Sequence, residues 1–289
     1  MAITISNVYI QTFERIVRHL AQQSDTKLRQ FITEASTNGE KHNWERVGAT
    51  DPTEKTSART ATPTADLAWS RRVSLAQTFH AGETYEPEDV VQMLVDPNSN
   101  IAQALASGMR RKVDDIIIAA ATGDALNGNG STSAFPAGQI VGDGTGVITL
   151  DTILETQEKF AKNDVDPDER KVMVIGPTQQ RKLLQTPEII SADYQSVKAL
   201  ATGMLPNFMG FDWVVSNRLL APAAGQIDCL AFTKRGIGVQ VNKDISAQVA
   251  QDPSLSFAWR IYTMMTMGAV RVMDEEVVAV RLLDAISAP

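Results

Sequence analysis

An uninterrupted amphipathic segment over residues 98–122 constrains the fold more than any other feature. Its apolar residues recur every three or four positions, which is the spacing of one face of an α-helix. Asn98, Ser99 or Asn100 can cap its start, and Gly123 stands where such a helix ends. About 25 residues make roughly 37 Å of helix, long for a globular domain, so the sequence predicts a rigid spine. The apolar stripe comprises Ile101, Leu105, Met109, Val113, Ile116, Ile117 and Ala120.

The polar face of this predicted helix carries closely spaced charges. Arg110 and Arg111 stand four residues before Asp114 and Asp115, a spacing at which opposite charges pair on a helix surface. Adjacent helical positions diverge by about 100°. We therefore interpret the two aspartates as a solvated or salt-bridged face rather than as a pair of metal ligands.

A polar run over residues 49–65, rich in Thr, Ser, Pro and Ala, contains almost nothing that can enter a core. Its flanks, residues 44–48 and 67–79, have the composition of strands, and the second flank alternates. The simplest interpretation is a β-hairpin that projects from the body. Because a two-stranded hairpin is marginal alone in water, it needs a surface to lie on, and another subunit is a natural candidate.

The rest of the chain mixes helical and extended segments, and no internal repeat of 20–50 residues is visible. The expected elements are an amphipathic helix over residues 7–32, a Gly-rich loop over 127–146, helices over 151–163 and 178–185, strands over 171–175 and 213–216, a hairpin of strands 229–233 and 237–241, and long extended runs over 256–266 and 269–283.

Charge and motifs exclude several classes of protein. The 27 Lys and Arg against 34 Asp and Glu give a formal charge of -7, which argues against a protein that mainly grips nucleic-acid phosphates. The lone Cys229 excludes a disulfide and a Cys-based zinc cluster, and with the missing signal sequence it indicates a reducing cytoplasm. No apolar run reaches the length of a membrane span.

Catalytic motifs are equally sparse. Residues 176–182 stand between a predicted strand and a predicted helix, as a phosphate loop would, but lack its second glycine. An ordinary strand–turn–helix connection is the better interpretation. We assign no catalytic, cofactor-binding or metal-binding residue, and we expect no cofactor.

Several stretches, taken in order, resemble one protein family. They are similar to the extended-loop return strand, the spine helix, the axial domain and the closing strands of the major capsid protein of tailed bacteriophages (Caudoviricetes), whose α+β fold is called Hong Kong 97-like. The stretches are TP at 62–63 with AWSRRV at 68–73, VDPNS at 95–99 with VDDIIIAAATG at 113–123, VIGPTQQ at 174–180, GMLPNFMGFDW at 203–213, and MGAVRVMDEEV at 267–277.

The resemblance implies a division of the chain into regions. These are an N-terminal arm (1–41), an extended hairpin loop (42–80), a peripheral domain (81–150) with the spine helix at 98–122, an axial α/β domain (151–241), and closing strands of the peripheral domain (242–289).

The resemblance further implies a structural protein without catalysis. Members of the family assemble as hexamers and pentamers into an icosahedral shell that encloses double-stranded DNA without sequence-specific binding. Expected partners are copies of the chain itself, a portal protein, and a scaffolding or decoration protein, with no membrane involved. Because the sequence starts at the arm, we expect a separate scaffolding protein or none. Assembly would take place in the bacterial cytoplasm, and the product would be the virion.

Basic residues near the expected surfaces are the candidate intersubunit contacts. The two basic doublets, Arg71-Arg72 and Lys234-Arg235, are too few to form a basic surface that binds nucleic acid. Pairing between subunits is therefore the preferred hypothesis. Some relatives cross-link a hairpin lysine to an asparagine of a neighbour; no motif here identifies such an asparagine or a catalytic acid, and we do not predict cross-linking. The candidates are Lys55, Arg59, Arg71, Arg72, Lys234 and Arg235.

Two other functions are kept as alternatives. An encapsulin-type nanocompartment shell shares the fold but packages an enzyme, and a small shell with protein cargo would distinguish it from a DNA-filled head. A small-molecule α/β enzyme would use residues 176–182 and nearby carboxylates. A monodisperse monomer with a ligand-dependent melting shift would favour that enzyme.

Overall fold

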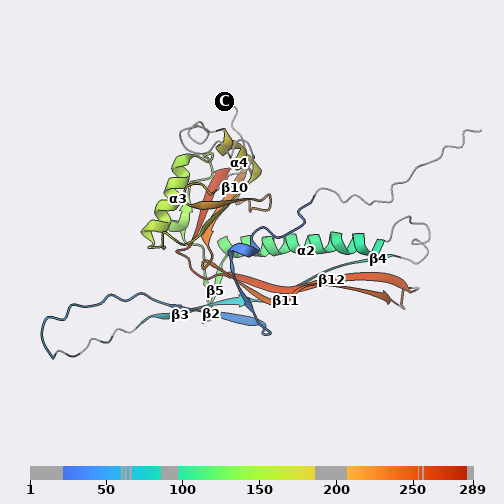
Figure 1. The fold of residues 1–289 in the computed structure, drawn as a ribbon, viewed down its shortest axis with the longest axis horizontal. Coiled ribbons are helices and arrows are strands. Elements are labelled where there is room, and N and C mark those ends of the chain that lie inside the picture. Colours follow the sequence, from blue (N-terminus) through green and yellow to red (C-terminus); the bar gives the residue numbers. More distant parts are fainter. Residues whose placement is uncertain are drawn as a thin grey trace, which may run out of the picture.

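The computed structural model describes residues 22–59, 61, 64, 67–85, 97–185, 207–252, 254–255 and 257–284. The described part is an α+β fold in which three sheets are arranged around one long helix (Figure 1). Helices α2, α3 and α4 span Pro97–Thr122, Leu150–Lys162 and Pro177–Leu184, and short 3-10 turns occur at Arg29–Phe31 and Ala137–Gln139.

The first sheet has the strand order β1-β11-β12-β4, with bounds Thr33–Ser36, Ile237–Asp252, Ala258–Arg271 and Gln77–Tyr85. The second has the order β7-β13-β10-β8-β9, with bounds Ile140–Val141, Val277–Leu283, Gln226–Thr233, Lys171–Ile175 and Phe211–Val215. The third has the order β2-β3-β5-β6, with bounds Lys41–Val47, Trp69–Leu75, Ala125–Asn127 and Thr132–Ser133.

Helix α2 is the predicted spine, and its described bounds differ from the expected ones by one residue. It ends because the Gly123 amide donates to the Ala119 carbonyl at 2.9 Å and the chain then turns away. Met109, Val113 and Ile117 are each at most 4% exposed and pack against the first sheet. The helix lies along β11 and β12, so its apolar stripe and that sheet form one core (Figure 1).

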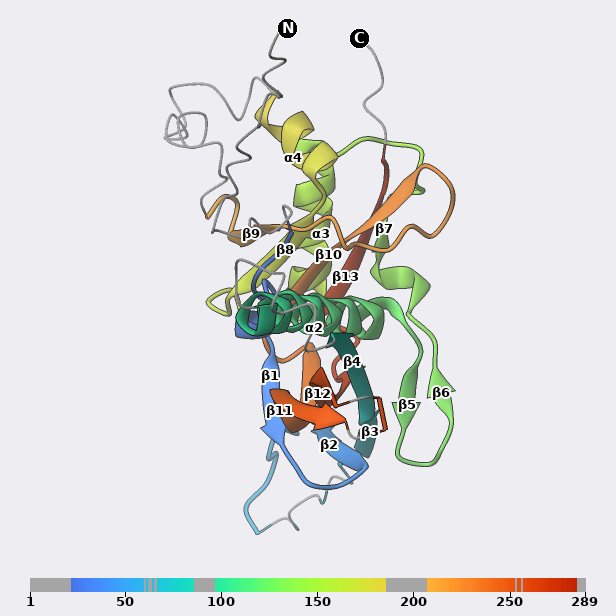
Figure 2. The same ribbon diagram turned by 90° about the vertical axis from the view of Figure 1, so that its right-hand side faces the viewer.

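The second sheet has its own core, with α3 and α4 beside it (Figure 2). Strand β8 is buried throughout, as its apolar sequence predicts, and it pairs parallel with β9 and antiparallel with β10. The N-terminus of α3 is capped by the Thr149 hydroxyl, which accepts from the Thr152 amide, two residues before the expected start at Asp151. Residues 176–182 form an ordinary strand-to-helix connection, as expected.

The expected hairpin of strands 229–233 and 237–241 is wrong. Strand β10 belongs to the second sheet and β11 to the first, so Lys234, Arg235 and Gly236 connect two sheets. A second connection, residues 272–276, lies beside the first and leads from β12 in the first sheet to β13 in the second. The two connections are held together because the Thr233 amide donates to the Glu276 carbonyl and the Val272 amide to the Gly236 carbonyl.

The sheets cross the boundaries of the expected regions, which stay a prediction. Strand β13 lies within the expected closing strands (242–289) and β7 within the expected peripheral domain (81–150), yet both pair in the sheet of the expected axial domain. Only three residues separate β10 from β11, and five separate β12 from β13. Sheet membership therefore changes within continuous extended segments, which composition alone does not reveal.

Two further sequence expectations need correction. The segment over 127–146 is not only a loop, because β5 and β6 form a small hairpin whose first strand pairs with β3. Residues 22–32 of the expected N-terminal helix contain only the 3-10 turn at Arg29–Phe31. Their backbone is bound to α2 instead, as described below. Residues 7–21 of that expected helix lie outside the described part of the chain.

Strands β2 and β3 form the predicted hairpin, from Lys41 opposite Leu75 to Val47 opposite Trp69. The hairpin lies on the first sheet at two glycines. A Cβ at Gly238 would stand 2.7 Å from the Trp44 ring, and one at Gly268 only 2.0 Å from the Leu75 carbonyl. Both positions need a residue without a side chain because another segment approaches this closely.

Candidate assembly interface

The connection between β2 and β3 projects from the body (Figure 1). Every described residue between 48 and 70 is exposed, including Lys55 and Arg59. Neither of these two basic side chains forms an ion pair with another described residue, and Arg59 adopts a left-handed backbone with φ of 58°. The exposed side chains of this segment are available to another molecule.

Apolar side chains are exposed where this connection meets the strands. Val47 and Trp69 face each other across the hairpin and are 47% and 69% exposed, and Leu67 is 41% exposed. A tryptophan left this open is costly in water and is characteristic of binding surfaces. Trp69 is not among the contact residues predicted from the sequence, although its place beside a polar projecting loop is a usable signal.

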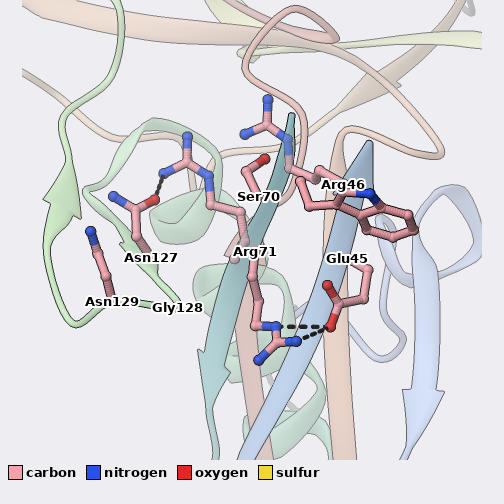
Figure 3. A pocket seen from close by; sticks show the side chains of 9 residues that line it. Glu45, Arg46, Ser70, Arg71, Asn127, Gly128 and Asn129 are labelled. Atoms are coloured by element: carbon pink, nitrogen blue, oxygen red, sulfur yellow. Dashed lines mark hydrogen bonds and ion pairs between the residues drawn. The ribbon is translucent and has the colours of Figure 1, made fainter. Parts of the chain in front are cut away.

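A cavity of about 580 Å³ opens beside this patch, between β2, β3 and the turn that joins β5 to β6 (Figure 3). We call it the hairpin-root pocket. Arg71 in its wall donates from Nε to the Glu45 carboxylate at 2.8 Å. The residues that line it include Glu45, Arg46, Trp69, Ser70, Arg71 and Arg72 of the hairpin and Asn127 of β5.

Arg72 is 4% exposed, and both of its Nη atoms donate hydrogen bonds within the subunit. One donates to the Asn127 side chain at 2.6 Å and the other to the Asp274 carboxylate at 2.5 Å. Burial lowers the pKa of the Arg72 guanidinium, and the Asp274 carboxylate opposes that change. Arg72, a candidate intersubunit contact, thus also fixes the root of the hairpin to the β12–β13 connection.

Arg271 completes this anchor and is fully buried. Its Nε donates to Asp274 at 2.6 Å, and its Nη atoms donate to the carbonyls of Ala121, Gly123, Ser133 and Ala134. One guanidinium therefore ties the end of α2, the β5–β6 hairpin and the β12–β13 connection together. The alternating valines around Arg271 do not predict this role, because the carbonyls that it binds are far away in the sequence.

Replacing Arg271 by methionine is expected to destabilise the subunit by about 3–5 kcal/mol, because four carbonyls lose a donor and the half-buried Asp274 carboxylate loses one of its two arginine partners. Chemical denaturation of unassembled protein measures this. Lys162→Met is the control, since it removes an exposed i,i+4 pair with Glu158 and should change the free energy of unfolding very little. Equal stability of wild type and R271M would contradict the anchor.

A second anchor holds the segment before β1 against α2. Asp114 is fully buried, and its carboxylate accepts from the amides of Lys27 and Leu28 at 3.0–3.2 Å and from the Gln23 side chain. Arg110 and Arg111 donate to the backbone or side chains of residues 22–24. The expected i,i+4 pairs on α2 are therefore wrong, because the arginines bind this segment and Asp115 pairs with Arg218.

Burial is the main cause that raises the pKa of Asp114 above its ordinary 3.8. The stability that this group contributes is therefore full below 3.8 and is lost as the pH rises through the folded-state pKa. We expect Asp114→Asn to weaken that decline. Melting temperatures of wild-type and D114N subunits between pH 4 and pH 7 test it, and parallel curves would contradict the assignment.

The remaining candidate contacts lie on the connection from β10 to β11. Lys234 and Arg235 are exposed; Arg235 reaches Glu169 at 3.5 Å, and the Lys234 carbonyl accepts from the Thr33 hydroxyl. Lys234 also lines a second open cavity beside Arg29 and Glu34. The structure thus separates the six candidates into the projecting loop, the hairpin root and this connection.

Residues 5–284 match the sequence model of a family described as phage capsid protein. The chain belongs to this family. No curated protein sequence matches the capsid protein. Within its described residues there is no helix that is long and apolar enough to cross a membrane, and no cluster of His, Cys, Asp and Glu suited to a metal ion.

Solved capsid structures share the fold of this capsid protein. The capsid of cyanophage P-SCSP1u has a TM-score of 0.76 at 17% identity, covering 96% of this chain and 94% of that one. The capsid of Ralstonia phage GP4 has a TM-score of 0.75 at 9% identity, covering 100% and 99%. A chain of Mycobacterium phage Che8 has a TM-score of 0.73 at 16% identity, covering 96% and 98%. The predicted α+β, Hong Kong 97-like fold is confirmed.

Proposed function

We propose that this phage capsid protein is the head-shell subunit of a tailed double-stranded DNA bacteriophage and assembles as hexamers and pentamers into an icosahedral shell. The observation that carries the proposal is the projecting hairpin of a capsid-family chain. The described residues of its connection are all exposed, and Trp69 at its root is 69% exposed. Covering such exposed surface with a neighbouring copy lowers the free energy. In a closed lattice every copy has a neighbour in the same position that can cover it.

The contacts between copies in this proposal come from the exposed basic residues and the hairpin root. Lys55 and Arg59 on the connection and Lys234 and Arg235 on the β10–β11 turn contact neighbouring subunits. Arg71 and Arg72 act through the hairpin-root pocket. The named regions follow the same scheme, with 42–80 as the extended loop, and with the second sheet at the centre of the capsomer.

The net charge of -7 supports a container whose DNA is held by confinement. The proposed partners are other copies of the chain, a portal protein and a scaffolding or decoration protein. Assembly takes place in the cytoplasm of the bacterial host. No cofactor and no catalytic step have a part in it.

Particles purified from producing cells test this function. Electron microscopy combined with nucleic acid extraction is expected to reveal large heads with double-stranded DNA when the phage's other genes are present. A small shell that contains an enzyme and no genome would contradict the proposal and favour a nanocompartment.

A further inference from the structure

The connection from β12 to β13 ends in three consecutive acidic residues, 274–276, which we call the acidic turn. Its last two residues are bound to the second sheet and its helix. The Glu276 carbonyl accepts from the Thr233 amide at 3.2 Å, and the Glu276 carboxylate accepts from the Thr233 hydroxyl. The Glu275 carbonyl accepts from the Asn163 side chain, at the end of α3, at 3.0 Å. A movement of the second sheet therefore moves this turn as well.

The same turn holds the β2–β3 hairpin. The buried Arg72 of β3 donates to the Asp274 carboxylate at 2.5 Å, and Arg46 of β2 pairs with the Glu275 carboxylate at 3.7 Å. The strand register places Arg72 opposite Trp44, two residues from Arg46 on β2, so both arginines lie on one face of the hairpin. Glu275 thus contacts the hairpin with its side chain and α3 with its backbone.

The first sheet supports the hairpin at a different place. The Trp44 ring lies against Gly238 of β11, and the Ser74 hydroxyl donates to the Gln240 side chain of the same strand at 3.0 Å. Arg46 lies nearer to the projecting connection than these contacts do. The hairpin therefore rests on the first sheet near one end and is held by the acidic turn closer to the part that projects.

We propose that the acidic turn couples the direction of the projecting hairpin to the position of the second sheet. A shift of the second sheet carries the turn with it through Asn163 and Thr233. The turn carries Arg46 and Arg72, and the hairpin pivots where Trp44 rests on the first sheet. The coupling is a property of one subunit and does not need the proposed shell. Within that shell, it links the contacts made by the hairpin to those made by the second sheet.

Distances between paired spin labels in unassembled subunits test the coupling. The first pair joins the hairpin to the second sheet, with Val47→Cys and Ala224→Cys, and the second joins the two sheets, with Ala247→Cys and Ala224→Cys. All three positions are exposed. The native Cys229 does not take the label, because it is fully buried and burial raises the pKa of its thiol to about 12.

Two variants cut the turn from its partners on opposite sides. Glu275→Gln removes the ion pair with Arg46, and Asn163→Ala removes the bond from α3, although Asn163 does not pair with the hairpin. We expect each to make the distribution of the first distance about twofold wider and to leave the second distance unchanged. Each should lower the melting temperature by less than about 5 °C, because the groups removed are partly exposed.

Matched controls separate coupling from a general loosening. Glu45→Gln breaks the hairpin's ion pair with Arg71, and Lys162→Met breaks the pair with Glu158 beside Asn163. Neither pair involves the turn, so neither variant should widen the first distance. Exchange of the two charges, Arg46→Glu with Glu275→Arg, should restore the narrow distribution.

A hairpin that keeps its wild-type distance distribution in both turn variants would overturn the coupling. Widening in the Glu275 variant but not in the Asn163 variant would also overturn it, because the turn would then hold the hairpin without relaying the second sheet. Because the distances are measured in single subunits, failure of the chain to form particles would contradict only the proposed function.

Discussion

Deleting residues 49–65 is expected to leave a folded subunit that no longer forms shells. The Gly48 amide already donates to the Ala68 carbonyl at 2.8 Å, so residues 66 and 67 can close a short hairpin turn without disturbing β2 or β3. Shortening an exposed loop changes the free energy of unfolding by only about 1 kcal/mol. The proposed contacts of Lys55 and Arg59 are lost completely.

Circular dichroism and thermal melting check the fold of the deletion variant, and electron microscopy checks assembly. A variant with a Gly/Ser linker of the original length in place of residues 49–65 separates the loss of side chains from the loss of length. We expect it to fail in assembly as well. Shells of wild-type size and stability from the deletion variant would show that the projecting hairpin is dispensable.

Met109→Asp is expected to unfold the subunit or to lower its melting temperature by about 10 °C or more. Met109 is 4% exposed in the core between α2 and the first sheet, and no described basic group is bonded to it there. An unpaired carboxylate at this place costs several kcal/mol, a large fraction of the stability of any domain.

Two control variants accompany this substitution. Gln103→Asp places the same charge on the exposed side of α2 and should cost less than about 1 kcal/mol. Met109→Leu conserves apolar volume and should cost less than about 1.5 kcal/mol. If M109D melted together with Q103D, the spine helix would not be buried on this face.

Much of the fold can be predicted from local sequence patterns. The spine helix and the β2–β3 hairpin follow from periodicity and turn composition, because each pattern is complete within its own segment. The prediction of a hairpin between β10 and β11 fails for the same reason, because a local pattern does not show which strand each one pairs with. Two alternating runs around a Lys-Arg-Gly turn look alike whether the strands pair with each other or, as here, with β13 and β12 in different sheets.

The candidate interface was predictable only in part. The exposed loop with Lys55 and Arg59 follows from its polar composition, whereas the roles of Asp114 and Arg271 depend on partners far away in the chain. Asp114 meets the Lys27 amide 87 residues before it, and Arg271 meets the Ala121 carbonyl 150 residues before it. The hairpin-root pocket likewise needs the β5–β6 turn, which the sequence indicated only as a loop.

Electron microscopy of the purified, overexpressed chain tests the central claim most directly. If exposed surface on each copy is covered only by its neighbours, the preparation contains closed shells or tubes built from five- and six-fold clusters. A uniform solution of single 31.4 kDa molecules at every concentration, with residues 49–65 packed on their own body, would contradict it.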